Sequence, residues 1–246
     1  MSDIVLLKKL IKLVGVPFEY SLDANENIIS IALTSPNSIF TSVIRQHSAS
    51  EKFEIITIIS KLDFLETLDI RRGLFLSLPD SMANLTNLKN LDIGSNYLNN
   101  IPPFISNFTN LEYLNLGVNN LTSIPRSMSK LFKLKALLLH KNKLTNIDES
   151  IINPNIEYLN LYLNFIKDIP IFVWNLNNLK AFSWGLSSIK KISPLIDNLS
   201  KLEYLTLVGN KLITLPDTFC NLRNLKAVRL HKNNIKNLPS EIGKLT

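Results

Sequence analysis

Residues 111–125, Leu-Glu-Tyr-Leu-Asn-Leu-Gly-Val-Asn-Asn-Leu-Thr-Ser-Ile-Pro, decide the fold, because most of the chain repeats their pattern. The pattern directs Leu111, Leu114 and Leu116 toward an apolar interior. The alternation around Leu114 and Leu116 predicts a strand with one buried face. Asn119 follows the strand and closes the turn. Each copy of the pattern is therefore expected to form one coil of the chain.

Eight copies follow one another without interruption. They begin at residues 65, 88, 111, 134, 156, 179, 202 and 225, so that six of the seven steps are 23 residues long and one is 22. Stacked coils would bring their strands side by side in parallel, about 4.8 Å apart. We expect residues 65–246 to form one solenoid that is continuous with the residues before it.

Two further positions of the repeat, counted from its first leucine, have a structural interpretation. Asparagine occupies the ninth position in six repeats, where its amide would pair with backbone groups that the sheet leaves unpaired. Gly73 and Ser187 replace it in the other two. Proline occupies the fifteenth position in six repeats, where its fixed φ suits a chain leaving a strand. The repeat with Ser187 also carries Phe182 and Trp184 at inward positions, which favours a local change of curvature.

The consensus L-x-x-L-x-L-x-x-N-x-L-x-x-I/L-P-x-x-I-x-x-L resembles that of the Ras-group class of intracellular leucine-rich repeat proteins, over about three quarters of the chain. Residues 20–33 also resemble the lead-in of prokaryotic arrays. The resemblance implies an α/β fold, a right-handed solenoid or horseshoe with a concave parallel β-sheet and convex loops or short helical turns. It implies that the concave sheet binds other macromolecules, without indicating which ones.

Residues 1–64 predict an N-terminal cap for the solenoid. Residues 1–14 have apolar side chains at helical spacing and predict an amphipathic helix, which Gly15 and Pro17 end. Two alternating segments around a polar turn then predict a β-hairpin. In its second strand, residues 28–33, the apolar residues have the same spacing as in the strand segment that begins each repeat.

An insertion over residues 34–64 interrupts the repeat spacing within this cap. Ser48 and Glu51 form a capping-box pattern that predicts a helix over residues 51–62. The helix would pack on the convex side or over the first repeat. Its buried face is predicted to consist of Phe53, Ile56, Ile59 and Leu62.

The composition favours an ordered protein in a reducing compartment. Hydrophobic residues make up 46% of the chain and charged residues 19%, which excludes disorder. The single cysteine, Cys220, excludes an internal disulfide framework. Lysines interrupt the apolar N-terminal segment, which is neither a signal peptide nor a membrane span. We therefore expect a protein of the cytoplasm, or one injected into a host cell.

The chain has no recognisable catalytic motif. No phosphate-binding loop, H-E-x-x-H, C-x-x-C or G-x-S-x-G pattern occurs in it. His140 and His231 occupy the same position four strands apart, on the order of 19 Å, and cannot share a metal ion. We expect no enzymatic activity, no cofactor and no metal site.

Two outward positions alternate along the repeats. The second position reads Glu66, Lys89, Glu112, Lys135, Glu157, Lys180, Glu203 and Lys226, which predicts a laterally continuous ladder of opposite charges. The third position reads Tyr113, Ala136, Tyr158, Ala181, Tyr204 and Ala227. The tyrosine rings either lean over the neighbouring alanines or serve as anchors for a protein partner, and the sequence leaves both interpretations open.

Positions five, seven and eight are expected to lie nearest the centre of the horseshoe. Along the repeats they change from mixed charges to an apolar and aromatic middle and then to a basic end, and exposed apolar side chains of this kind usually indicate an interface. The predicted apolar contacts are Tyr113, Leu138, Tyr158, Tyr162, Leu163 and Leu186. The predicted electrostatic contacts are His140, Lys141, Arg229, His231 and Lys232.

The sequence therefore predicts a non-enzymatic protein-interaction module, such as a signalling scaffold, that binds its partner on the concave face. The net charge of +7 arises in residues 134–246, which carry fifteen basic and eight acidic side chains, so an acidic partner is favoured. Nucleic acid is disfavoured, because the tyrosines are not interleaved with lysines. Two alternatives are a sensor segment of a larger GTPase, kinase or ligase protein, and self-association through an uncapped C-terminal end.

Overall fold

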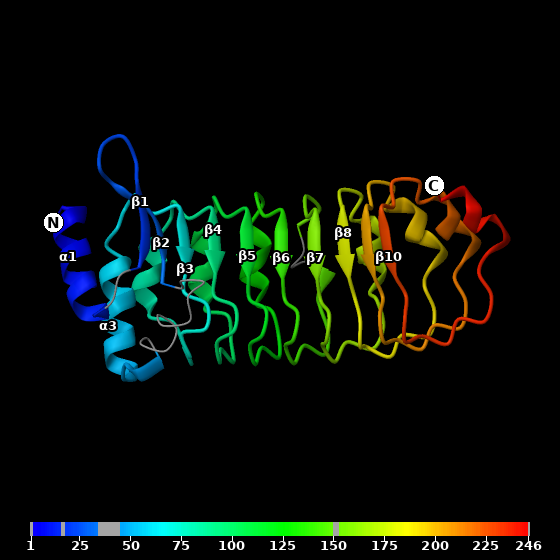
Figure 1. The fold of residues 1–246 in the computed structure, drawn as a ribbon, viewed down its shortest axis with the longest axis horizontal. Coiled ribbons are helices and arrows are strands. Elements are labelled where there is room, and N and C mark those ends of the chain that lie inside the picture. Colours follow the sequence, from blue (N-terminus) through cyan, green and yellow to red (C-terminus); the bar gives the residue numbers. More distant parts are fainter. Residues whose placement is uncertain (1, 16–17, 34–44, 150–152, 246) are drawn as a thin grey trace.

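Ten strands lie side by side in one sheet, in the order of the sequence (Figure 1). The structure is a computed structural model that describes residues 2–15, 18–33, 45–149 and 153–245. The first two strands are antiparallel and every later neighbour is parallel, so the predicted stacking of the repeats is confirmed. The strands are β1 Glu19–Leu22, β2 Ile28–Ala32, β3 Thr67–Asp69, β4 Asn90–Asp92, β5 Tyr113–Asn115, β6 Ala136–Leu138, β7 Tyr158–Asn160, β8 Ala181–Ser183, β9 Tyr204–Thr206 and β10 Ala227–Arg229.

On the convex side the coils return through single turns of 3-10 helix. These turns are η1 Asp80–Asn84, η2 Pro103–Asn107, η3 Arg126–Lys130, η5 Ile171–Asn175, η6 Pro194–Asn198, η7 Asp217–Asn221 and η8 Ser240–Lys244. Six of them have the proline of the fifteenth position as their N-cap. Before η6, Ser193 takes this place, and its hydroxyl accepts the N–H of Leu195 at 3.2 Å. The fixed φ of proline therefore prepares the convex turn, and not the exit from the strand as the sequence suggested.

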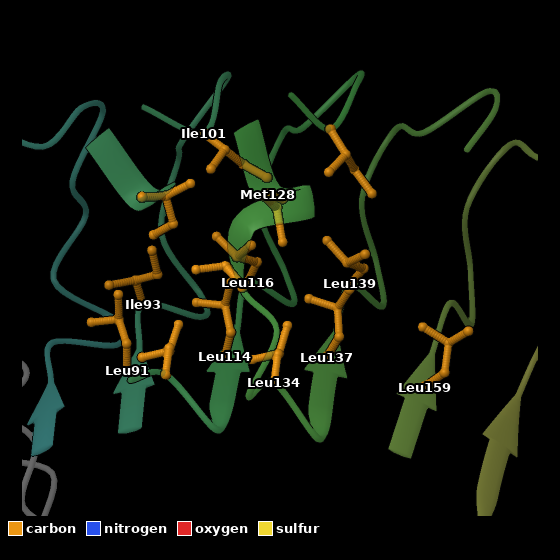
Figure 2. Packing of buried hydrophobic residues seen from close by; sticks show 14 of the residues in the cluster. Leu91, Ile93, Ile101, Leu114, Leu116, Met128, Leu134, Leu137, Leu139 and Leu159 are labelled. Carbon is orange, nitrogen blue, oxygen red and sulfur yellow. The ribbon is translucent and has the colours of Figure 1, made fainter. Parts of the chain in front are cut away.

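Leucines of successive coils pack on one another to form the core (Figure 2). Leu114 lies in β5 and Leu116 directly follows it, and both side chains are fully buried. Met128 of η3 packs in the same layer. One hydrophobic cluster extends in this way from Leu6 to Leu222. Beyond it, inward side chains of the last coil such as Val228 are only partly buried, and self-association at this end stays a prediction.

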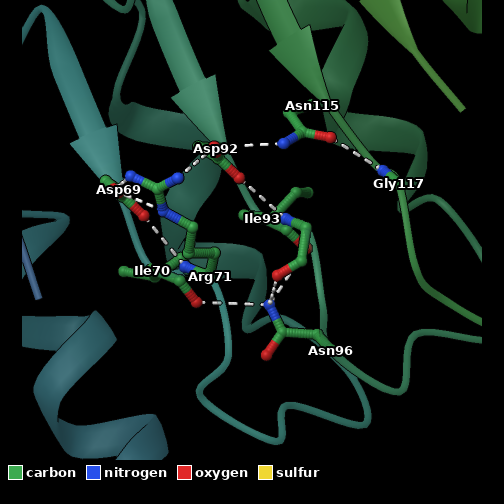
Figure 3. Close-up of polar contacts among 9 residues, drawn as sticks. Asp69, Ile70, Arg71, Asp92, Ile93, Asn96, Asn115 and Gly117 are labelled. Carbon is green, nitrogen blue, oxygen red and sulfur yellow. Dashed lines mark hydrogen bonds and ion pairs between the residues drawn. The ribbon is translucent and has the colours of Figure 1, made fainter. Parts of the chain in front are cut away.

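Asparagines at the ninth position connect the coils through hydrogen bonds, as predicted. The side-chain oxygen of Asn119 accepts the N–H of Leu98 in the preceding coil at 3.0 Å. Its amide nitrogen donates to the carbonyls of Ile93 and Leu116, at 3.1 and 3.0 Å. The same arrangement recurs at Asn96 (Figure 3), Asn142, Asn164, Asn210 and Asn233.

The sixth repeat interrupts this connection. Ser187 replaces the asparagine, and its hydroxyl donates only to the carbonyl of Gly185, at 3.3 Å. In neighbouring coils the residue at position ten donates its N–H to the coil before it, as Phe165 does to Leu144 at 2.8 Å. Within the described residues, Ser188 makes no such bond to Ile166, and the N–H of Ile166 has no asparagine to accept it. Coils five and six are therefore held together less tightly than the others at this edge.

The N-terminal cap consists of two helices and the β1–β2 hairpin. The first helix, α1 Asp3–Val14, ends at Gly15 in the left-handed conformation, as expected; Pro17 lies outside the described residues. The carboxylate of Asp3 accepts the N–H of Ile28 at 2.9 Å and so connects α1 to β2. Since β2 pairs in parallel with β3, the second strand of the hairpin is the first strand of the parallel part of the sheet, as predicted.

The predicted inserted helix is α3 Ala49–Ile59, and the part of the insertion at residues 34–44 lies outside the described residues. Its capping box is present, with the Ser48 N–H donating to the Glu51 carboxylate at 2.7 Å. The predicted buried face was partly wrong, because Phe53 is exposed whereas Ile55 and Ile58 are buried. The helix packs against both α1 and η1, so its buried face is wider than one stripe of residues.

We expect Asn119→Ala to lower the free energy of unfolding by about 2 kcal/mol or more, because the N–H of Leu98 would lose its buried acceptor. Asn100→Ala is the matched control, because Asn100 is exposed and makes no side-chain hydrogen bond in the described structure. It should change stability by less than about 0.5 kcal/mol. Chemical denaturation followed by circular dichroism measures both, and equal losses would contradict the proposed role of Asn119.

We expect Ser187→Asn to raise the melting temperature by about 2–4 °C, the shift that about 1 kcal/mol produces in a chain of this size. The new amide would accept the N–H of Ile166 and restore the connection between coils five and six. Ser187→Ala is the control, because it removes the hydroxyl without supplying an amide, and it should not stabilise the protein. A melting temperature below that of the wild type for Ser187→Asn would show that the gap cannot be closed in this way.

Candidate functional site

The charged side chains at the second position form separate ion pairs. Four lysine–glutamate pairs have N–O distances of 2.6–2.7 Å. The pairs are Lys89–Glu66, Lys135–Glu112, Lys180–Glu157 and Lys226–Glu203. Among the described residues no ion pair joins one pair to the next, so the predicted continuous ladder is wrong in this respect. These charges are already paired within the sheet and are poorly suited to holding a partner.

At the fifth position, acidic and amide side chains cap the backbone at the end of the strand. The carboxylate of Asp92 accepts the N–H of Gly94 at 3.0 Å, and the side-chain oxygen of Asn115 accepts that of Gly117 at 2.9 Å (Figure 3). Asp69 caps Arg71 in the same way, and Asn160 caps Tyr162. Such local bonds are typical of Asx turns.

The first repeats add a charged network to these caps. The Arg71 guanidinium lies 2.6 Å from Asp69 and 3.8 Å from Asp92 (Figure 3). Burial raises the pKa of the Asp92 carboxyl, although its hydrogen bond from Gly94 acts in the opposite direction. Burial likewise raises the pKa of Tyr113, which lies next to this network. The mixed charges at the start of the sheet are thus satisfied by one another, and Tyr113 belongs to this region.

A hollow lies on the concave face over β7, β8 and β9. Its volume is about 170 Å³. We call it the concave hollow, and it is lined by Leu138, Tyr158, Leu159, Asn160, Ala181, Phe182, Ser183, Tyr204 and Thr206. Leu159 and Phe182 belong to the buried core, whereas Tyr158 and Tyr204 are 43% and 48% exposed. The hollow is therefore a shallow depression between two accessible rings.

The two tyrosines of the hollow flank the small side chain of Ala181. In the register of the sheet, Ala181 pairs with Tyr158 on one side and with Tyr204 on the other. Alternate strands are about 9.5 Å apart, so the alanine leaves a gap between the rings that a side chain of a partner can enter. The alternation of large and small residues therefore continues across neighbouring strands, and both rings are accessible beside the alanine.

The residues at the seventh position lean away from each other. The imidazole of His140 lies over Gly117 and the ring of Tyr162 lies over Gly185, where in each case a Cβ atom would collide with the ring. Burial, with the positive charge of Lys141, lowers the pKa of His140, so the ring is uncharged at neutral pH. The positive charge predicted here comes from Lys141.

The eighth position lies outside the strand in every repeat. All eight residues have a positive φ, between 54° and 70°, and they are Arg72, Ser95, Val118, Lys141, Leu163, Leu186, Gly209 and Lys232. This left-handed turn ends the strand, so Lys141, Leu163, Leu186 and Lys232 lie at the edge where the strands end. We call this the strand-exit edge. The sequence placed these residues nearer the centre of the sheet, because only Gly209 indicated such a turn.

Arg229, the one basic residue of the last strand, lies beside the concave hollow, whereas His231 and Lys232 follow the strand. Arg229 of β10 pairs in register with Thr206, which lines the hollow. Arg229, His231 and Lys232 are all exposed. Of the predicted contacts, Leu138 and Tyr158 line the hollow directly, and Arg229 lies one strand from it. The structure does not bring Tyr113 to the same place.

Sequence reasoning missed Tyr204 and the polar residues that surround the gap. The alternation at the third position already included Tyr204, which could have been selected because it follows Tyr158 two strands later. Asn160, Ser183 and Thr206 line the hollow but carried no signal, because their residue types vary from repeat to repeat.

Within the described residues, no three histidine, cysteine, aspartate or glutamate side chains are grouped closely enough to hold a metal ion. No helix in the described part of the chain is long and apolar enough to span a membrane.

Two family models match parts of the chain, both described as leucine-rich repeat. One covers residues 86–144 and the other residues 201–222. No curated protein matches the sequence. Only a repeat domain is identified by these comparisons, without a catalytic domain.

Solved structures with the same fold include plant receptors and a type III effector. The Arabidopsis receptor kinase HAESA, in complex with the peptide hormone IDA and the co-receptor SERK1, is 22% identical with a TM-score of 0.77, over 99% of this chain and 44% of HAESA. The ectodomain of the Arabidopsis thaliana receptor kinase GASSHO1/SCHENGEN3, in complex with CASPARIAN STRIP INTEGRITY FACTOR 2, is 25% identical with a TM-score of 0.63, over 88% of this chain and 28% of that one. The leucine-rich repeat domain of the type III effector XopL is 24% identical with a TM-score of 0.67, over 84% of this chain and 86% of that one.

This chain thus spans less than half of the two receptor structures. Like them it stacks parallel strands on one side and short turns on the other, around leucines that recur every 22 or 23 residues. Residues 86–144 and 201–222 match leucine-rich repeat models, and the spacing and the sheet extend the same solenoid fold over the rest of residues 65–245.

Proposed function

We propose that this protein is a non-enzymatic binding module that holds an acidic protein or peptide partner on its concave sheet. The observation that carries the proposal is the concave hollow between Tyr158 and Tyr204. Both rings are accessible and stand on a sheet whose own backbone is fully paired in the strands. A rigid platform with exposed tyrosines loses little conformational entropy when it binds.

The lining of the hollow suits a protein ligand. Ala181 and Leu138 offer apolar contacts, and Asn160, Ser183 and Thr206 offer side-chain hydrogen-bond donors and acceptors. Such a mixture of aromatic, apolar and polar groups is typical of protein interfaces. The hollow is too shallow to enclose a small molecule, because ligand pockets usually exceed about 300 Å³.

Charge supports an acidic partner. Arg229 is exposed one strand from the hollow and Lys232 is exposed just beyond the same strand, whereas the lysines of the second position are neutralised by glutamates. Unpaired positive charge next to an apolar contact accelerates the association of acidic partners and favours them over basic ones.

The comparisons support a protein or peptide as the partner. HAESA and GASSHO1/SCHENGEN3 have this fold in complexes with a peptide hormone and with a protein factor, respectively. We further infer from the 23-residue steps that the chain belongs to the Ras-group class. The single, buried Cys220 supports a reducing compartment such as the cytoplasm.

We expect the double variant Tyr158→Ala, Tyr204→Ala to weaken partner binding at least about tenfold, because aromatic anchors at the centre of an interface contribute most of its affinity. The melting temperature should change little, since both side chains are nearly half exposed. Affinity capture from native lysate with wild type and variant, followed by mass spectrometry, identifies the partner. Its dissociation constant is then measured with the purified protein.

The matched control is Tyr20→Ala, Tyr97→Ala, which removes two tyrosines of similar exposure, 46% and 48%, outside the hollow. This control should retain the partner. A partner that binds both double variants as tightly as the wild type would refute a concave site at Tyr158 and Tyr204.

A further inference from the structure

A second and larger pocket lies at the strand-exit edge, where the connection between coils five and six is interrupted. Its volume is about 520 Å³. We call it the strand-exit pocket, and it is lined by Asn164, Phe165, Lys167, Asp168, Leu186, Ser187, Ser188, Lys190 and Lys211. Leu186 was predicted to contact a partner on the concave face, but its side chain lines this pocket and packs against Gly209. The pocket is separate from the concave hollow, with which it shares no residue.

The pocket has a physical cause in the missing asparagine. Ser187 is too short to bridge the coils, and Ser188 adopts a left-handed conformation with φ of 63°. As a result neither the N–H nor the carbonyl of Ile166 has the partner that the equivalent groups have in neighbouring coils of the described structure. Backbone groups in this situation favour a ligand that brings its own donors and acceptors, as an extended peptide does.

Three lysines in the pocket carry unneutralised charge. Lys167 and Lys190 occupy the same position in adjacent coils, and Lys211 follows in the next coil. None of the three forms an ion pair with another described residue, although Asp168 also lines the pocket. At the second position, by contrast, every lysine has a glutamate at 2.6–2.7 Å. Like charges held in adjacent coils repel, and an anionic ligand removes that repulsion.

Apolar groups border the lysines. The ring of Phe165 is 63% exposed and Leu186 is 40% exposed, both on the lining of the pocket. Large exposed apolar side chains beside unpaired charges favour a ligand that combines both characters. A lysine ammonium is a point charge without the planar fork of arginine, so single carboxylates suit this site.

We infer that the strand-exit pocket binds an extended acidic segment of a protein, in which carboxylates contact Lys167, Lys190 and Lys211 and a neighbouring apolar side chain contacts Phe165 and Leu186. The inference depends on contacts of its own and not on the proposed function of the concave hollow. The same partner can occupy both surfaces, but either surface can bind without the other.

The test uses the full chain and a labelled peptide, acetyl-Glu-Glu-Leu-Glu-Glu-amide, with the glutamine analogue as its control. We expect the glutamate peptide to bind at least about tenfold more tightly, and to shift the backbone amide resonances of Phe165, Ser188 and Lys211 in NMR titrations. Equal binding of the two peptides, or resonance shifts confined to other surfaces, would overturn the inference.

Two triple variants distinguish the effect of the pocket lysines from the effect of the net charge of the protein. The triple variant Lys167→Gln, Lys190→Gln, Lys211→Gln should weaken peptide binding at least about tenfold. Lys8→Gln, Lys12→Gln, Lys61→Gln removes the same charge from exposed lysines of the cap and should change binding less than about twofold. Equal losses in the two triple variants would reduce the effect to the net charge and contradict the inference.

Ser187→Asn provides a test in which weaker binding cannot be explained by unfolding of the variant. We expect this variant to melt at a higher temperature than the wild type and yet to bind the glutamate peptide more weakly, because it closes the gap. The Tyr158→Ala, Tyr204→Ala variant should bind the peptide as the wild type does, so failure of the concave hollow leaves this inference intact. A single-stranded oligonucleotide of equal charge that binds the pocket more tightly than the peptide would assign the site to nucleic acid instead.

Discussion

The amide side chain at the ninth position of the repeat is the interaction on which the rest of the structure depends. Strands of only three residues leave most of each coil without a regular ladder, so buried backbone groups beyond the strand need other partners. Asn119 pairs with three of these groups. Its side-chain oxygen accepts the N–H of Leu98, and its amide nitrogen donates to the carbonyls of Ile93 and Leu116. Because two of these groups belong to the preceding coil, the same side chain also fixes the distance between coils. The core leucines can then stack in register from one coil to the next.

This constraint divides the surface into parts that the fold uses and parts that remain free. Glutamates and lysines of the second position neutralise each other, and Asp92 and Asn115 of the fifth position cap their own strand ends. Where the fifth position carries Leu138, Ser183 or Thr206, no such cap forms, and these side chains line the concave hollow instead. The available binding surface therefore lies in the middle and C-terminal coils, where Leu138, Ser183 and Thr206 do not cap the ends of their strands.

Much of this organisation is readable in the sequence because it repeats. The strands and the role of the asparagines follow from a pattern that every coil repeats. The hairpin and the capping box of Ser48 do not repeat, but each is defined by a short local pattern of its own. The pairing of Lys89 with Glu66, and not with Glu112, is not readable, because the two glutamates are equally distant along the repeat. The left-handed turn at the eighth position is hidden by residues such as Val118, which rarely adopt it. Pockets are harder still, since they result from contacts that a coil fails to make.

The strand-exit pocket illustrates how a deviation from the repeat can be more informative than the repeat itself. An asparagine at position 187 would satisfy Ile166 and stabilise the stack, yet a serine stands there, together with Trp184 and Phe182 in the core beneath it. Both rings are buried, and the indole N–H of Trp184 has no hydrogen-bond partner among the described residues, so the deviation leaves polar groups unpaired in the core as well as at the edge. Ser187 and Ser188 line the same pocket as three unpaired lysines and the exposed ring of Phe165. A loss of backbone hydrogen bonds that coincides with unpaired lysines and an exposed aromatic ring favours a binding site over an arbitrary defect in the repeat.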